Sequence, residues 1–217
     1  MGRRIALAFV VLPLAFAMLA AIGVGAGWLA VHTLQPMELG ADRWMTAHRS
    51  GAITTVMLAF TAIAGEQAVI VMVAITVVVL LVARQVADAV GVALSAAGML
   101  SMYELIVRLV GRHRPPVTRI DDPGGSSFPS GHVANSTALY VAVLIALYLV
   151  TRRRGPLMLG AGLAGVLLLG IGVSRVYLGL HYPSDVVAGF GLGLAWALVV
   201  GRTVDAISLP RARRAPA

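Results

Sequence analysis

Cysteine and lysine are both absent from this chain of 217 residues. The missing cysteine excludes disulfide bonds and thiolate metal ligands, and it leaves the redox compartment undetermined. Charged residues make up only 12% of the sequence, whereas an average soluble domain has about 25%. Hydrophobic residues make up 59%, and the mean hydropathy is +0.90. This composition indicates that lipid surrounds much of the chain.

The positive charge of the chain comes entirely from arginine and gives a net charge of +8. A strongly basic protein can bind nucleic acid, but these arginines lie in short clusters between apolar runs, which is typical of membrane orientation signals. We therefore predict no nucleic-acid partner. The few acidic and histidine residues form no metal-binding motif, so we predict neither a metal nor a cofactor. The sequence gives no oligomeric state.

Long apolar runs predict an all-α fold, a polytopic membrane helix bundle of about six transmembrane helices in one domain, residues 1–217. The first run, 5–31, is longer than the apolar core of about 7–15 residues in a signal peptide, so we expect an anchor helix, with a cleaved signal as the alternative. Residues 35–50 are expected to form a polar loop. The region 51–83 is interrupted at Gly65-Glu66, which predicts a broken or interfacial helix followed by a span. The later spans are expected at 67–83, up to 110, 131–150, 156–174 and 184–201.

The arginine clusters also predict an orientation, because cytoplasmic loops retain positive charge. A cytoplasmic N-terminus places ten arginines inside and seven outside, and both termini then lie in the cytoplasm. The inside set is Arg3, Arg4, Arg84, Arg152, Arg153, Arg154, Arg202, Arg211, Arg213 and Arg214. The outside set is Arg43, Arg49, Arg108, Arg112, Arg114, Arg119 and Arg175.

Three short segments at span ends carry the residues suited to chemistry: 111–115 (GRHRP), 129–132 (PSGH) and 174–185 (SRVYLGLHYPSD). Counting spans places all three on the outer face, so they can meet in one pocket. Ionisable residues beside membrane spans are costly and are candidates for function. The candidate set is Arg114, Arg175, His132, His181 and Asp185.

These residue types suit phosphoryl transfer. Arginine forks match phosphate oxygens, and fixed cations stabilise the charge of the transition state. Pro129 stands where a helix can begin, so the backbone N–H groups of residues 130–132 would form an anion site. His181 and Asp185 are four residues apart, which lets the carboxylate hold one imidazole nitrogen while the other attacks. His132 would then protonate the departing oxygen.

The segments resemble the motifs of the type 2 phosphatidic acid phosphatase family, which also includes the vanadium haloperoxidases. The family pattern is K-x6-R-P, then P-S-G-H, then S-R-x5-H-x3-D, and the last two are complete here. In the first, only Arg114-Pro115 matches; Val107 stands in the lysine position and Arg108 is the nearest cation. The resemblance implies that His181 is the nucleophile, that Asp185 orients it, that His132 is the acid, and that no metal is needed. The phosphate ligands that it implies, with Arg108 in place of the lysine, are Arg114, Arg175, Ser130, Gly131, Ser174 and Arg108.

The predicted function is a membrane lipid phosphate phosphatase that acts through a phosphohistidine intermediate. Candidate substrates are polyprenyl diphosphate, phosphatidic acid and phosphatidylglycerol phosphate, and an outward pocket favours the polyprenyl carrier. A lipid phosphotransferase with the same site, or a non-catalytic lipid transporter, are the alternatives.

Several other residues have predicted places. Arg112 is expected to bind either phosphate or lipid headgroups, and Glu66 either to face an interface or to lie near the pocket. Tyr177 and Tyr182 are predicted interfacial aromatics. The glycines expected to allow close helix packing are Gly160, Gly162, Gly165 and Gly170.

Overall fold

A computed structural model describes residues 2–121 and 124–208, and all of its regular elements are helical. The predicted all-α class is therefore confirmed. Arg211, Arg213 and Arg214, which were predicted to be cytoplasmic, lie outside the described residues. The elements are α1 (Gly2–Leu29), the π-helix η1 (Ala30–Leu34), α2 (Gln35–Ala47), α3 (Gly51–Ala62), α4 (Glu66–Val82), α5 (Val86–Val110), α6 (Gly131–Thr151), α7 (Arg154–Tyr177) and α8 (Pro183–Ile207).

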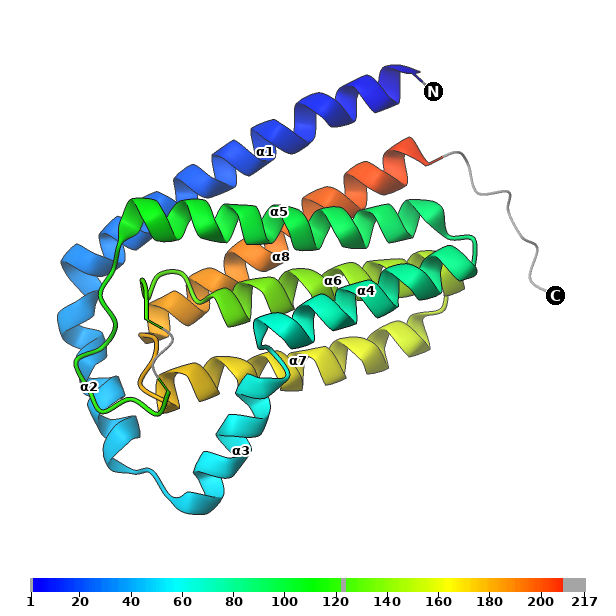
Figure 1. Cartoon of the computed structure of the whole chain (residues 1–217). Helices are drawn as coiled ribbons and strands as arrows, with labels where there is room; N and C mark the ends of the chain where they lie inside the picture. The colour runs from blue at the N-terminus through cyan, green and yellow to red at the C-terminus, as the bar shows by residue number, and fades with distance from the viewer. Residues whose placement is uncertain (1, 122–123, 209–217) are drawn as a thin grey trace.

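Within the described part of the chain, five helical segments are long and apolar enough to cross a membrane. The pair α3 and α4 becomes a sixth if it counts as one broken span, because its two halves meet at a bend of 47°. The predicted polytopic bundle is thereby confirmed. In Figure 1, α1 begins and α8 ends at one end of the bundle, whereas α2, the loop before α6 and the turn before α8 lie at the opposite end.

The expected polar loop at 35–50 was wrong, because Gln35–Ala47 is the helix α2 and continues α1 through the π-helical turn. Pro36 lies in the first turn of α2, directly after the π-helical turn that joins α1 to α2. Asp42 is buried and Glu38 contacts α8, whereas Met37 and Trp44 are exposed. Two of the polar residues that suggested a loop, Glu38 and Asp42, thus lie on the inward face of a helix.

Helices α5, α6 and α8 pack together with α1 into the main core. Its buried side chains include Met99, Met102, Ile106, Ala134, Ala138, Trp196 and Val200. Gly193 lets α8 approach α6 closely, since a Cβ atom at this position would lie 2.5 Å from the carbonyl oxygen of Ala134. This contact packs the beginning of α6, next to the second motif, against the middle of α8.

The four glycines of α7 that were predicted to allow close helix packing divide into two pairs. Gly160 and Gly170 face close neighbours, Leu144 and Phe60 respectively, as predicted. For Gly162 and Gly165 the prediction was wrong, because an added Cβ would meet nothing within 4 Å.

Candidate active site

A cavity of about 660 Å³ lies between α4, α5 and the beginning of α6. One end is formed by charged and polar residues of the motifs, and the remaining wall is apolar. The polar residues are Glu66, Tyr103, Glu104, Arg114, Ser126, His132, Asn135, Arg175 and His181, with Gly124, Gly125 and Gly131. The apolar residues are Ala64, Val69, Ile70, Val73, Ala74, Val77, Ala96, Ala97, Leu100 and Val107. The structure thus brings residues of all three motifs to one cavity.

His181 lies in the turn between α7 and α8, and its imidazole is buried. Its Nδ1 lies 2.6 Å from the carbonyl oxygen of Ser127. A carbonyl oxygen only accepts hydrogen bonds, so Nδ1 carries the proton and Nε2 keeps its lone pair. Nε2 lies 3.3 Å from Nη1 of Arg114 at the cavity wall. Burial lowers the pKa of His181 to about 4, against a smaller raising effect of the nearby Asp185 carboxylate. The ring is therefore neutral at neutral pH.

Asp185 is the third residue of α8 and is fully buried. Its Oδ2 accepts the backbone N–H of Tyr182 at 2.8 Å and the hydroxyl of Ser127. Its Oδ1 pairs with Nη1 of Arg112 at 2.5 Å. The distance from Oδ2 to His181 Nδ1 is 3.6 Å, longer than a hydrogen bond. Ser127 therefore joins the two residues, with its carbonyl on His181 and its hydroxyl on Asp185.

The two motif arginines at the cavity are held by neighbouring groups. Arg114 donates from Nη1 to the carbonyl oxygen of Leu180 at 2.7 Å, and from Nη2 to that of Gly124 at 2.8 Å. Arg175 is buried and donates from Nη1 to the hydroxyl of Thr61 in α3. Its Nε has no hydrogen-bond partner among the described residues. Both cations are thus fixed in place before any anion binds.

The second motif lies at the beginning of α6, where Ser130 is the N-cap. Pro129 precedes the cap, so its predicted place in the first turn was wrong by two positions. The N–H of Ser130 donates to the carbonyl oxygen of Asp185 at 3.0 Å, which ties the two helix starts together. Gly131 and His132 line the cavity. The Ser130 hydroxyl is buried and makes no hydrogen bond to the residues that are described.

Three predicted phosphate ligands lie outside the cavity wall: Ser130, Arg108 and Ser174. The Arg108 side chain is 78% exposed and pairs with Glu104 at 3.6 Å. Val107 lines the cavity instead, because one residue along a helix rotates a side chain by about 100°. The Ser174 hydroxyl is buried and donates to the carbonyl oxygen of Ile171 within α7.

Sequence reasoning missed Ser127 and Glu38, and it placed three other residues wrongly. Arg112 was expected at phosphate or lipid headgroups, yet its side chain is fully buried against Asp185 and Glu38. Tyr177 and Tyr182 are buried and not interfacial. All of these contacts join positions far apart in the chain, and no motif or spacing signals them.

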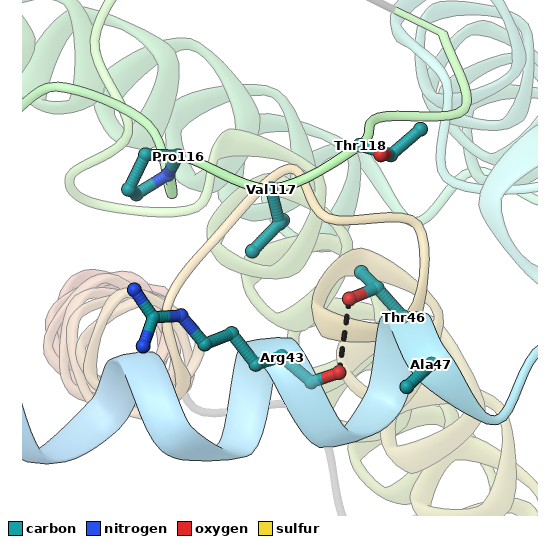
Figure 2. Close-up of a pocket in the computed structure, with 6 residues that line it drawn as sticks. All are labelled: Arg43, Thr46, Ala47, Pro116, Val117 and Thr118. Atoms are coloured by element: carbon teal, nitrogen blue, oxygen red, sulfur yellow. Dashed lines mark hydrogen bonds between the residues drawn. The ribbon is translucent and has the colours of Figure 1, made fainter.

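A second hollow, of about 690 Å³, lies between α2 and residues 116–118 (Figure 2). Arg43, Thr46 and Ala47 form its floor, and the Thr46 hydroxyl donates to the carbonyl oxygen of Arg43 at 3.1 Å. It contains none of the residues singled out for phosphoryl transfer. Within residues 2–121 and 124–208, no three histidine or acidic side chains are grouped so that they could hold a metal ion.

Comparison with known proteins identifies phosphatases that are similar to part of this chain. The chain is 34% identical over 95 residues to phosphatidylglycerophosphatase B of Bacillus subtilis. The aligned residues cover 43% of this chain and 46% of that protein. The chain is 39% identical over 113 residues to decaprenylphosphoryl-5-phosphoribose phosphatase of Mycobacterium tuberculosis, covering 50% and 55%. The aligned part is thus about half the length of each relative.

The fold also matches a solved structure. The crystal structure of a transmembrane PAP2 type phosphatidylglycerolphosphate phosphatase from Bacillus subtilis superposes with a TM-score of 0.77 at 23% identity, covering 96% of this chain and 98% of that one. Together with the apolar helices, these matches show an integral membrane protein. Residues 88–208, more than half of the chain, match the sequence profile of the PAP2 superfamily. As the motifs predicted, the chain belongs to the PAP2 superfamily, the type 2 phosphatidic acid phosphatase family.

Proposed function

We propose that the protein is a lipid phosphate phosphatase that acts through a phosphohistidine intermediate. The observation that carries the proposal is the cavity itself, in which two histidines and two arginines meet an apolar wall. The wall extends along α5 from Val107 to Ala96, eleven residues and therefore about 16 Å. A phosphate at the polar end would leave an attached hydrocarbon chain lying between α4 and α5.

The chemistry follows from the positions of the two histidines. The Nε2 lone pair of His181 attacks phosphorus, and the bond from phosphorus to the lipid oxygen breaks. His132 gives its proton to that oxygen, and Arg114 and Arg175 stabilise the charge on the other phosphate oxygens. Water then attacks the phosphohistidine with His132 as the base, which releases phosphate and restores both histidines.

The proposed substrates are lipid phosphomonoesters or diphosphates. Relatives named for phosphatidylglycerol phosphate and for decaprenylphosphoryl-5-phosphoribose support this class. Purified protein in detergent would be incubated with ³²P-labelled polyprenyl diphosphate, phosphatidic acid and phosphatidylglycerol phosphate. Release of free phosphate supports a phosphatase, whereas a labelled second lipid identifies a transferase. Release from none of these lipids would refute the proposal.

The two histidine roles are separable by leaving group. His181→Ala should abolish a trapped phosphoenzyme, because the attacking nitrogen is gone. His132→Ala should retain phosphoenzyme formation from an aryl phosphate, whose leaving group needs little protonation. Equal losses with aryl and alkyl phosphates would contradict the acid role.

Activity is expected to survive EDTA and to be inhibited by vanadate.

We further propose that the site faces the outer side of the membrane, with both termini cytoplasmic. The arginine distribution supports this orientation. Reporter fusions after Arg154 and after Arg202 should both read cytoplasmic, and an external signal at either would overturn it.

A further inference from the structure

Beside the cavity, but outside its wall, lies a second group of buried charged side chains centred on Arg112. Nη1 of Arg112 pairs with Asp185 at 2.5 Å and donates to the Ser184 hydroxyl at 2.8 Å. Nη2 pairs with Glu38 at 2.8 Å. The guanidinium carbon lies 3.9 Å from the centre of the Tyr182 ring, and the side chain is 0% exposed. A buried guanidinium is stable only while its anionic partners stay beside it, so Arg112 requires both Asp185 and Glu38 in these positions.

Glu38 brings a second anion to the same place from a different helix. Its Oε1 accepts the backbone N–H of Ser184 at 2.5 Å, and its Oε2 accepts the Ser184 hydroxyl at 2.9 Å. Ser184 is in the first turn of α8, where free N–H groups and the helix dipole favour negative charge. Glu38 belongs to α2, which lies outside residues 88–208 that match the family.

These contacts form one continuous chain that ends at the candidate nucleophile. Glu38 binds Arg112, Arg112 binds Asp185, and Asp185 binds the Ser127 hydroxyl. The carbonyl oxygen of Ser127 then accepts from His181 Nδ1 at 2.6 Å. Any loosening of Asp185 therefore reaches His181 through Ser127.

We propose that Arg112 and Glu38 are positioning residues that hold Asp185 and Ser127, and through them set the orientation of His181. The N-terminal helix α2 is thereby part of the active-site support. This inference rests on the proposed function for its kinetic test. Neither residue lines the cavity, so neither is expected to bind the substrate phosphate.

The test compares Arg112→Met, Arg112→Lys, Glu38→Gln and the double variant Glu38→Gln/Arg112→Met, using phosphate release from a lipid and from an aryl phosphate. Arg112→Met should lower kcat by about 10- to 100-fold, the range found at metal sites when a group that orients a ligand side chain is removed. KM and inhibition by vanadate should change by less than about 2-fold, because the phosphate ligands remain. Arg112→Lys should recover part of the loss. The double variant should be no slower than Arg112→Met, since Glu38 acts through Arg112.

The matched control is Arg43→Met, which removes an exposed arginine from the same helix as Glu38 and should leave kcat unchanged. Thermal unfolding in detergent is measured for every variant. A wild-type kcat in Arg112→Met overturns the proposal, as does a parallel weakening of vanadate binding or a loss of kcat that only follows the melting temperature. If Arg112→Met does not fold, Arg112→Lys and Glu38→Gln decide by the same criteria.

A further readout separates this inference from the proposed function. If the wild-type protein hydrolyses aryl phosphate but no lipid phosphate, the proposed lipid phosphatase function is refuted. The kinetics with aryl phosphate then still test whether Arg112 and Glu38 position His181. If it hydrolyses neither, diethyl pyrocarbonate labelling of His181, followed by mass spectrometry, replaces turnover. The labelling rate should change several-fold in Arg112→Met and Glu38→Gln but not in Arg43→Met. An unchanged rate in both overturns the inference.

Discussion

The Nδ1–H of His181 donates to the backbone carbonyl oxygen of Ser127 over 2.6 Å. In the better-known arrangement, a carboxylate accepts this hydrogen and fixes the tautomer of a catalytic histidine. Here Oδ2 of Asp185 is 3.6 Å from Nδ1 of His181. A main-chain acceptor cannot be removed by a side-chain substitution, so the tautomer of His181 does not depend on Asp185 alone.

This geometry predicts unequal costs for the two members of the His181–Asp185 pair. Asp185→Asn should lower kcat by about 10- to 100-fold, well short of the loss of about 10⁴-fold that accompanies a wrong tautomer. His181→Ala should leave no measurable turnover. Phosphate release by both variants, with their melting temperatures as a control for folding, checks this. An Asp185→Asn protein as inactive as His181→Ala, yet folded, would show that the carbonyl alone does not hold the ring.

The pH dependence should reflect the buried imidazole. Burial lowers the pKa of His181 to about 4 from the ordinary 6.5, so the nucleophile stays neutral until the pH falls to about 4. Protonation removes the attacking lone pair, and activity is therefore lost only below that value. The acid limb of kcat/KM for an aryl phosphate, corrected for substrate ionisation, should lie well below pH 6. A limb centred near 6.5 would indicate a solvated ring.

Val107 and Arg108 provide a matched pair for the missing family lysine. Because Arg108 is 78% exposed and paired with Glu104, Arg108→Ala should change kcat by less than about 2-fold. Val107 lines the cavity, so Val107→Lys should place a cation at the polar end and tighten inhibition by vanadate. Vanadate titrations of both variants test this, and a steep loss of turnover in Arg108→Ala would restore the role expected from the sequence.

Gly193 and Gly191 test the packing of α8 on α6. A Cβ at Gly193 would lie 2.5 Å from the Ala134 carbonyl oxygen, so Gly193→Ala should separate the helices and cost about 1–3 kcal/mol. A Cβ at Gly191 meets nothing within 4 Å, so Gly191→Ala should be neutral or add up to about 1 kcal/mol of helix stability. The melting temperature in detergent should therefore fall for Gly193→Ala and stay unchanged or rise for Gly191→Ala. Equal shifts would contradict the contact.

Much of the fold follows from local sequence. The expected spans 131–150, 156–174 and 184–201 correspond to Gly131–Thr151, Arg154–Tyr177 and Pro183–Ile207, because long apolar runs between breakers leave few alternatives. The break at Gly65 was also visible, since α4 begins at Glu66. The helix α2 was not predicted, because polar residues such as Glu38 and Asp42, which face protein, resemble a loop in composition.

For the site too, one part could be predicted from local sequence and another part could not. The motif residues Arg114, His132, Arg175 and His181 line one cavity, since each motif lies where a helix begins or ends, at the same end of the bundle. The orientation of a single side chain could not be predicted in this way. Val107 lines the cavity and the neighbouring Arg108 is exposed, the reverse of what the motif suggested. Arg112 binds Glu38, which lies 74 residues away in the sequence. Such pairings depend on how helices pack, which no short motif encodes.

The apolar wall of the cavity has a consequence for how the enzyme should be assayed. Under the proposed function, a lipid reaches His181 along α4 and α5 while its chain remains in the hydrocarbon layer. Encounter is then a two-dimensional search, governed by how many substrate molecules share each micelle or vesicle with the protein. Diluting the substrate with inert detergent at constant bulk concentration should slow the reaction, and Michaelis constants acquire meaning only as surface mole fractions.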